Sequence, residues 1–97
     1  MSLEECRKEI DTIDIEIVSL LSRRANVVKN VGVIKAKAGL PIVDVEREDE
    51  VLSRILQRNE GVWENELLLK IYGIILQNSR KMQIEAKAEL ALAKEII

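Results

Sequence analysis

The stretch LLSRRANVVKNVGVIK, Leu20–Lys35, is apolar at nearly every position that a helix would bury, yet Arg24 occupies one of those positions. The spacing of three and four residues continues on both sides of this stretch, in the manner of a heptad repeat. We call the resulting stripe the seam, and it consists of Leu3, Cys6, Ile10, Ile13, Ile17, Leu20, Arg24, Val27, Val31, Ile34 and Ala38. Gly39 and Pro41 then supply a C-terminal cap and a helix breaker. The sequence therefore predicts one long helix over about residues 3–38, roughly 53 Å in length.

Two further helices follow from the rest of the chain. Asp44 is a candidate N-cap for a short helix over about residues 45–58, which Asn-Glu-Gly at 59–61 ends. A third helix is predicted over about residues 64–95, because its apolar residues recur at helical spacing and no stop signal follows. Few Gly and Pro residues and 2% aromatic residues are typical of helical proteins. We predict an all-α fold of three helices, long, short and long, in a single domain spanning residues 1–97.

The length of the first helix predicts a second chain. A chain of 97 residues buries a modest fraction of its surface by itself. A helix of this length needs packing partners along its whole extent to be stable. A second copy of the chain supplies them most simply, so we predict a homodimer.

Composition excludes several classes of function. The sequence has no histidine and one cysteine, Cys6, which argues against zinc, Ser-His chemistry and an internal disulfide. A net charge of −2 gives no general attraction to nucleic acid. The N-terminus is charged from its fourth residue, and no uninterrupted apolar segment approaches about 18 residues. We expect a cytoplasmic protein that uses no metal or cofactor and binds neither nucleic acid nor membrane.

Three cationic residues of the first helix are candidates for a binding site. Arg24 must meet a carboxylate, a bound anion or solvent, because a buried, unpaired charge is unstable. An ion pair with a glutamate of another helix is the alternative to a ligand. Lys35 follows by 11 positions, close to three turns, and therefore leaves the same side of the helix roughly 16 Å away. Arg7 lies roughly 42 Å from Lys35, so it can serve a similar site only in a partner chain.

The other two helices add neutral and acidic candidates. Asp44, Arg47 and Glu48 gather at the start of the second helix, where backbone N–H groups are also available, although capping and surface ion pairing explain them as well. Ser79 and Gln83 are four residues apart on an apolar face of the third helix, which favours hydrogen bonding to a ligand or to another helix. Together the candidates suit a small dicarboxylate, and a reaction whose transition state needs only positioning and electrostatic stabilisation.

With these residues the sequence resembles the all-helical (type II) chorismate mutase family. The matching motifs span about Leu3 to Ala86 and are CRKEID with Arg7, Asp14 after it, LLSRR with Arg24, GVIK with Lys35, PIVDVERE with Asp44, Arg47 and Glu48, and NSRKMQ with Ser79 and Gln83. The resemblance implies an intertwined homodimer with two active sites. It also implies rearrangement of chorismate to prephenate, an isomerase reaction that leads to phenylalanine and tyrosine.

The resemblance further implies a role for each candidate residue. Arg24 and Arg7 of the partner subunit would hold the two carboxylates of chorismate, with Arg47 and Ser79 supporting that end. The catalytic donors to the breaking ether bond would be Lys35 and Gln83. The remaining candidates, the backbone at Asp44 and the carboxylate of Glu48, would hold the ring hydroxyl.

Two other functions fit the same pattern. An isochorismate pyruvate-lyase uses a similar fold and a cationic pocket to release pyruvate and salicylate. A non-catalytic helical dimerisation module would keep the same charges solvated or paired. The tail after Ala86 matches no motif and is read as a helix extension or a docking element.

Overall fold

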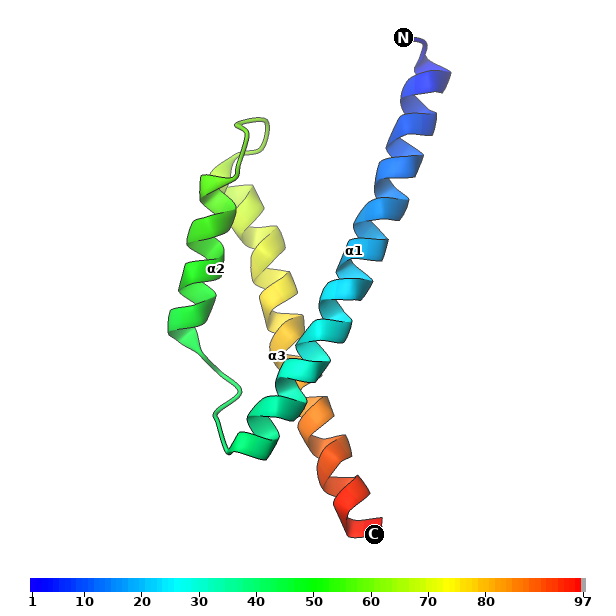
Figure 1. Cartoon of the computed structure of the whole chain (residues 1–97). Coiled ribbons are helices and arrows are strands. Elements are labelled where there is room, and N and C mark those ends of the chain that lie inside the picture. Colours follow the sequence, from blue (N-terminus) through cyan, green and yellow to red (C-terminus); the bar gives the residue numbers. More distant parts are fainter. Residues whose placement is uncertain (97) are drawn as a thin grey trace.

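The computed structural model describes residues 1–96, and this range contains three helices and no strand (Figure 1). Helix α1 spans Leu3–Ala38, α2 spans Val45–Gln57 and α3 spans Asn65–Ile96. The predicted all-α fold with the order long, short, long is confirmed. Relative to the predicted bounds, α2 ends one residue earlier, α3 begins one residue later, and α3 continues to Ile96.

Local capping fixes the ends of α1 and the start of α2. The Ser2 side chain accepts a hydrogen bond from the Glu5 N–H at 3.1 Å, which satisfies one donor in the first turn of α1. Gly39 has a φ of 67°, a left-handed conformation that residues with a side chain rarely adopt, and it turns the chain away from α1. The Asp44 carboxylate accepts from the Arg47 N–H at 3.0 Å and caps α2, as the sequence predicted.

The α1–α3 crossing sets the architecture (Figure 1). α3 crosses the C-terminal half of α1, while α2 lies beside the N-terminal part of α3. Gly32 is buried at the crossing, and a Cβ atom there would lie 2.9 Å from the Cα atom of Gln83 and 3.1 Å from the Cβ atom of Ala86. Only glycine lets the two helices approach so closely.

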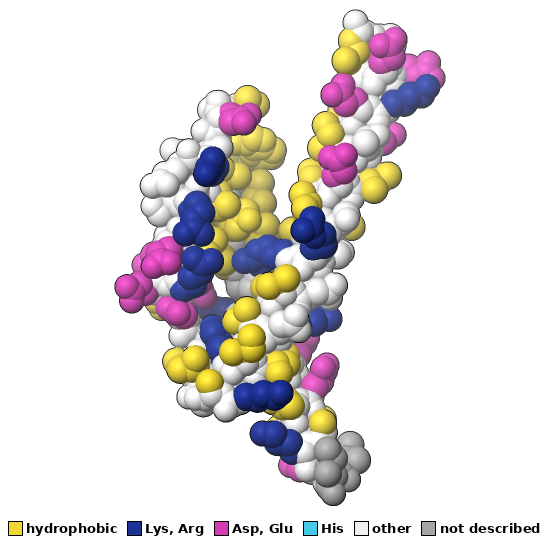
Figure 2. Space-filling model, in the orientation of Figure 1, with side chains coloured by type: hydrophobic (Ala, Val, Ile, Leu, Met, Phe, Trp, Pro, Cys, Tyr) yellow, Lys and Arg dark blue, Asp and Glu magenta, His cyan; other side chains and the backbone are white. Residues whose placement is uncertain are grey.

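The face of α1 that packs on α3 lies mostly beside the predicted seam, although the seam residues Arg24 and Val31 are half-buried there. Its residues are the buried Gly32 and the half-buried Ala25, Val28 and Ala36, each displaced by one or two positions from a seam residue. Most seam residues stay exposed, including Ile10, Ile17 and Leu20 with exposed fractions of 54%, 50% and 57%. The crossing therefore leaves the seam exposed along most of α1, and hydrophobic side chains are visible on the projecting half of this helix in Figure 2.

The size of the molecule is unusual for a chain of this length. The Cα radius of gyration is 17.4 Å, whereas a compact domain of 100 residues has about 13 Å. The chain exposes 7947 Å², whereas a compact monomer of 11.0 kDa exposes about 5,600 Å². This extended shape agrees with the projection of the N-terminal half of α1 away from the crossing (Figure 1).

None of the helices within residues 1–96 combines the length and the apolar character that crossing a bilayer requires.

Candidate functional site

A cavity of about 270 Å³ lies beside the α1–α3 crossing and is closed on one side by the start of α2. Seven of the eight candidate residues predicted from the sequence line it, namely Arg24, Lys35, Asp44, Arg47, Glu48, Ser79 and Gln83. Apolar side chains from all three helices, such as Val28, Val51 and Leu76, form the rest of the wall. The crossing thus brings together residues that lie up to 59 positions apart in the sequence, Arg24 and Gln83 being the most distant pair.

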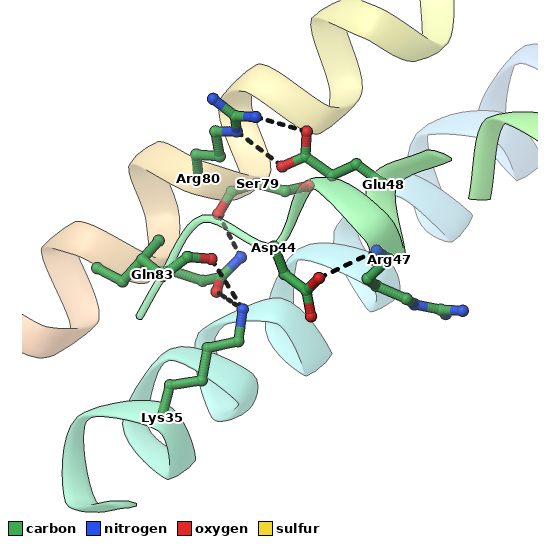
Figure 3. Close-up of polar contacts among 8 residues, drawn as sticks. Lys35, Asp44, Arg47, Glu48, Ser79, Arg80 and Gln83 are labelled. Carbon is green, nitrogen blue, oxygen red and sulfur yellow. Dashed lines mark hydrogen bonds and ion pairs between the residues drawn. The ribbon is translucent and has the colours of Figure 1, made fainter. Parts of the chain in front are cut away.

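Lys35 and Gln83 form one polar cluster at the crossing (Figure 3). The Lys35 ammonium donates to the Gln83 Oε1 atom at 2.9 Å and to the Ile42 carbonyl at 2.8 Å. The Gln83 Nε2 atom donates to the Ser79 carbonyl at 3.3 Å. An ammonium has three N–H donors and a side-chain amide has two, so each group keeps one donor for a ligand.

Arg24 pairs with a hydroxyl group and not with a carboxylate. Its Nη1 atom donates to the Ser79 Oγ atom, and this hydroxyl donates in turn to the Ile75 carbonyl at 2.8 Å. Ser79 is 7% exposed and Arg24 is half-buried. Within residues 1–96, no carboxylate lies within 4.0 Å of the Arg24 guanidinium, whereas four other ion pairs are formed. The guanidinium therefore faces the cavity with most of its five donors unused.

Glu48 pairs with Arg80, a residue that the sequence analysis missed (Figure 3). The Arg80 Nε and Nη2 atoms donate to the two carboxylate oxygens of Glu48, each at 2.7 Å. These hydrogen bonds lower the pKa of the Glu48 carboxyl group below its ordinary value, against the opposing effects of partial burial and of Asp44. They also raise the pKa of the Arg80 guanidinium. Arg80 precedes Gln83 by three residues, so helical spacing was a signal that could have found it.

Asp44 and Arg47 both line the cavity, but their charged groups make contacts within α2 and its cap. The Asp44 carboxylate caps α2, and its hydrogen bond to the Arg47 N–H is drawn in Figure 3. The Arg47 side chain extends away from Lys35 and Gln83 in that view, and its Nη1 atom lies 3.4 Å from a Glu50 carboxylate oxygen. Since this side chain is half exposed, the ion pair is a weak constraint and the guanidinium can turn toward a ligand.

Arg7 does not reach the cavity of its own chain. It is exposed near the N-terminal end of α1, at the far end of the projecting half of the helix (Figure 1). The structure thus brings seven candidates together and places the eighth, Arg7, outside the cavity. The described residues, 1–96, hold no group of three or more Cys, Asp or Glu side chains that could bind a metal ion.

The chain is therefore a three-helix protein with a cavity beside the α1–α3 crossing, in which cationic side chains outnumber carboxylates. The sequence matches the family model described as chorismate mutase type II over residues 6–84. The chain therefore belongs to the type II chorismate mutase family, an isomerase family, and the resemblance found in the sequence is confirmed.

Two relatives illustrate how the chain compares in sequence. It is 45% identical over 93 residues to a bifunctional chorismate mutase/prephenate dehydratase from Aquifex aeolicus, a match that covers 92% of this chain and 25% of the relative. It is 39% identical to a chorismate mutase from Methanocaldococcus jannaschii, with 84% of this chain and 83% of the relative covered. The chain thus spans about a quarter of the bifunctional protein and most of the single-function one.

Solved structures agree with this assignment. A chorismate mutase from Thermus thermophilus superposes with a TM-score of 0.80 at 32% identity, covering 84% of this chain and 92% of that one. The chorismate mutase from Helicobacter pylori in complex with prephenate superposes with a TM-score of 0.79 at 36% identity, covering 90% and 94%. The similarity therefore includes the whole arrangement of three helices.

Proposed function

We propose that this chain converts chorismate to prephenate by holding the substrate in its reactive conformation and stabilising the charge that develops in the transition state. The observation that carries the proposal is the pair of donors at the crossing, Lys35 and Gln83, beside a guanidinium that has no carboxylate partner within residues 1–96. The reaction is unimolecular and requires no proton transfer. A site without histidine, built from fixed donors, suits that chemistry.

Lys35 and Gln83 act on the ether oxygen of chorismate. In the rearrangement the ether C–O bond breaks while a C–C bond forms, and negative charge builds on the oxygen. The remaining N–H donors of both residues lie next to each other because their side chains are hydrogen bonded at 2.9 Å. Donors that are already placed where an oxyanion develops contribute about 3–4 kcal/mol each in other enzymes.

The two substrate carboxylates bind to the arginine residues. Arg24 presents a guanidinium whose planar donors match a carboxylate in a bidentate contact. Its orientation is fixed by Ser79, which supports the same end of the site together with Arg47. Arg7 of the partner subunit holds the second carboxylate. The ring hydroxyl binds at the opposite wall, between the backbone at Asp44 and the carboxylate of Glu48.

The active protein is a homodimer with two such sites. The seam residues Ile10, Ile13, Ile17 and Leu20 are between 45% and 57% exposed, and a stripe of this kind is typical of an interface between helices. A second copy packed along the seam would bury this surface and carry its own Arg7 toward the cavity. The cytoplasmic location stays a prediction from the sequence.

The test is to incubate the purified protein with chorismate and, separately, with isochorismate. Prephenate from chorismate supports the proposal, whereas salicylate and pyruvate from isochorismate would assign the chain to the pyruvate-lyases. Sedimentation of the same protein determines how many chains the assembly contains. Replacement of Lys35 or Arg24 by alanine should lower kcat/KM by about 10²–10³-fold with the dimer intact. Unchanged turnover in both variants would contradict the roles proposed for these residues, whereas a wild-type protein that makes no product from either substrate would be a non-catalytic dimerisation module.

A further inference from the structure

We propose that Arg80 is a positioning residue, which holds the Glu48 carboxylate in one orientation on the cavity wall so that it accepts a hydrogen bond from the substrate hydroxyl. This inference rests on the proposed function, because Glu48 is assigned there to the hydroxyl. It adds a residue that has no assigned role and gives the ion pair between α2 and α3 a purpose in substrate binding.

The geometry distinguishes this ion pair from the others in the chain. Both Arg80 donors contact Glu48 at 2.7 Å in a fork, and the Glu48 side chain is only 22% exposed. The other three ion pairs formed within residues 1–96 join neighbours on one helix, and their side chains are more than half exposed. Such surface pairs contribute little, whereas a bidentate arginine–carboxylate pair fixes the direction of both groups. Arg80 and Glu48 also both line the cavity.

The pairing leaves Glu48 able to bind a hydroxyl. Each carboxylate oxygen has two lone pairs, and the fork uses one of them on each oxygen. One lone pair on each oxygen therefore stays available, and Arg80 determines where it points. An aliphatic side chain in place of Arg80 would leave the carboxylate free to rotate about its side-chain bonds.

The charges around Glu48 give a second, electrostatic reason for its pairing with Arg80. The groups around Glu48 are Arg24 and Lys35 from α1, Asp44 and Arg47 from the start of α2, and Arg80 from α3. The proposed substrate carries two carboxylates, which an unpaired Glu48 anion would repel. The positive charge of Arg80 compensates that of Glu48, and the carboxylate can still accept a hydrogen bond from the substrate hydroxyl. Arg80 also lowers the pKa of Glu48, which favours the ionised carboxylate.

The experiment compares Arg80→Met with the matched control Lys81→Met, which removes a positive charge from the next, exposed position. For Arg80→Met we expect KM to rise about tenfold and kcat to change by less than about threefold, because the hydroxyl contact exists in both the substrate and the transition state. The acid limb of kcat/KM should move to higher pH. Arg80→Lys should restore part of the loss, since lysine supplies the charge without the fork. Lys81→Met should behave as the wild type.

A double substitution tests whether Arg80 acts through Glu48. In a Glu48→Gln background the acid limb due to this carboxyl group is absent, so Arg80→Met should cause little further loss. Losses that add, or an Arg80→Met variant with the KM and acid limb of the wild type, would overturn the inference. If the Arg80–Glu48 ion pair only stabilised the fold, Arg80→Met would have a lower melting temperature and an unchanged KM in its folded fraction.

A measurement without substrate separates this inference from the proposed function. The ¹³C signal of the Glu48 carboxyl group, followed by NMR during a pH titration, should have its midpoint at higher pH in Arg80→Met than in the wild type. An unmoved midpoint overturns the inference even in an active enzyme. A wild-type protein that makes no prephenate contradicts the proposed function instead, and the NMR titration still decides whether Arg80 controls Glu48.

Discussion

The two halves of α1 have the same apolar periodicity and different surroundings. Residues 25–36 pack against α3 and carry Lys35 into the cavity, with the buried Gly32 at the closest approach. Residues 3–20 project away from the other helices of the chain, and they expose Ile10, Ile13 and Ile17 (Figures 1 and 2). One half thus packs on another helix of the chain, although its seam residues Val27 and Ile34 stay 61% and 63% exposed, and the other half projects from the crossing.

This difference teaches that a periodic apolar stripe predicts an interface without saying which surface covers it. The packed half uses a face adjacent to the seam, and the projecting half keeps the seam itself exposed. The residues of the candidate site are also distributed between the packed side of the molecule and the projecting half of α1. Seven of its residues come from the packed side of the molecule, while Arg7 lies on the projecting half. A second chain would complete both the packing and the site.

The largest effect is expected from breaking the seam. Ile17→Asp places a charge in the proposed interface, which should weaken association by at least about a hundredfold and abolish activity. Ile15→Asp is the matched control, because Ile15 lies off the seam and is 72% exposed, compared with 50% for Ile17. Sedimentation and the prephenate assay measure the two properties. Equal behaviour of the two variants would contradict assembly through the seam.

The next prediction uses the division of the site between chains. Arg7→Ala and Lys35→Ala homodimers should each lose most of their activity, about 10²-fold or more, because every site lacks one residue. Heterodimers of the two variants, isolated with two affinity tags, contain one site that lacks both residues and one intact site. They should therefore recover about half of the wild-type activity per dimer. Heterodimers as inactive as the parents would mean that Arg7 does not serve the partner's site.

A smaller effect is expected at the helix crossing. Gly32→Ala forces the α1 and α3 backbones apart, because the new methyl group would lie 2.9 Å from the Cα atom of Gln83. Overpacking of this kind lowers the free energy of unfolding by about 1–3 kcal/mol. Gly73→Ala is the control, since a Cβ atom there meets no atom within 4 Å. Its helix propensity should make the protein up to about 1 kcal/mol more stable. Urea denaturation compares the two variants, and equal stabilities would argue against a tight crossing.

The smallest effect concerns pH. Because the proposed reaction involves no proton transfer, kcat should be nearly constant from about pH 6 to 9. The lowered pKa of Glu48 stabilises the folded state above the ordinary value of 4.5, and this contribution is lost as the pH falls through the lower folded-state pKa. Acid unfolding of Glu48→Gln should therefore depend less on pH than that of the wild type. A bell-shaped kcat profile centred near neutrality would reveal a titrating catalytic group.

Individual residues show where sequence reasoning was sufficient. Gly39 and Asp44 were recognised as caps, because capping depends on local conformation and on one side chain. Lys35 and Gln83 were recognised as polar candidates from their helical spacing. Arg80 was missed although it lies three residues before Gln83, because helical spacing alone does not reveal its partner on another helix. The outward direction of Arg47 was also beyond prediction, since it depends on the rotamer of a long side chain.

The sequence by itself determined the three helices, their approximate ends, the family and the chemical character of the site. These properties follow from local spacing and from residue types, which tertiary packing does not alter. Only the tertiary structure decided that α3 packs beside the seam, that Gly32 sets the crossing distance, and that Arg80 binds Glu48. Each of these depends on how two distant helices meet, and the crossing geometry results from side-chain shapes on both surfaces together.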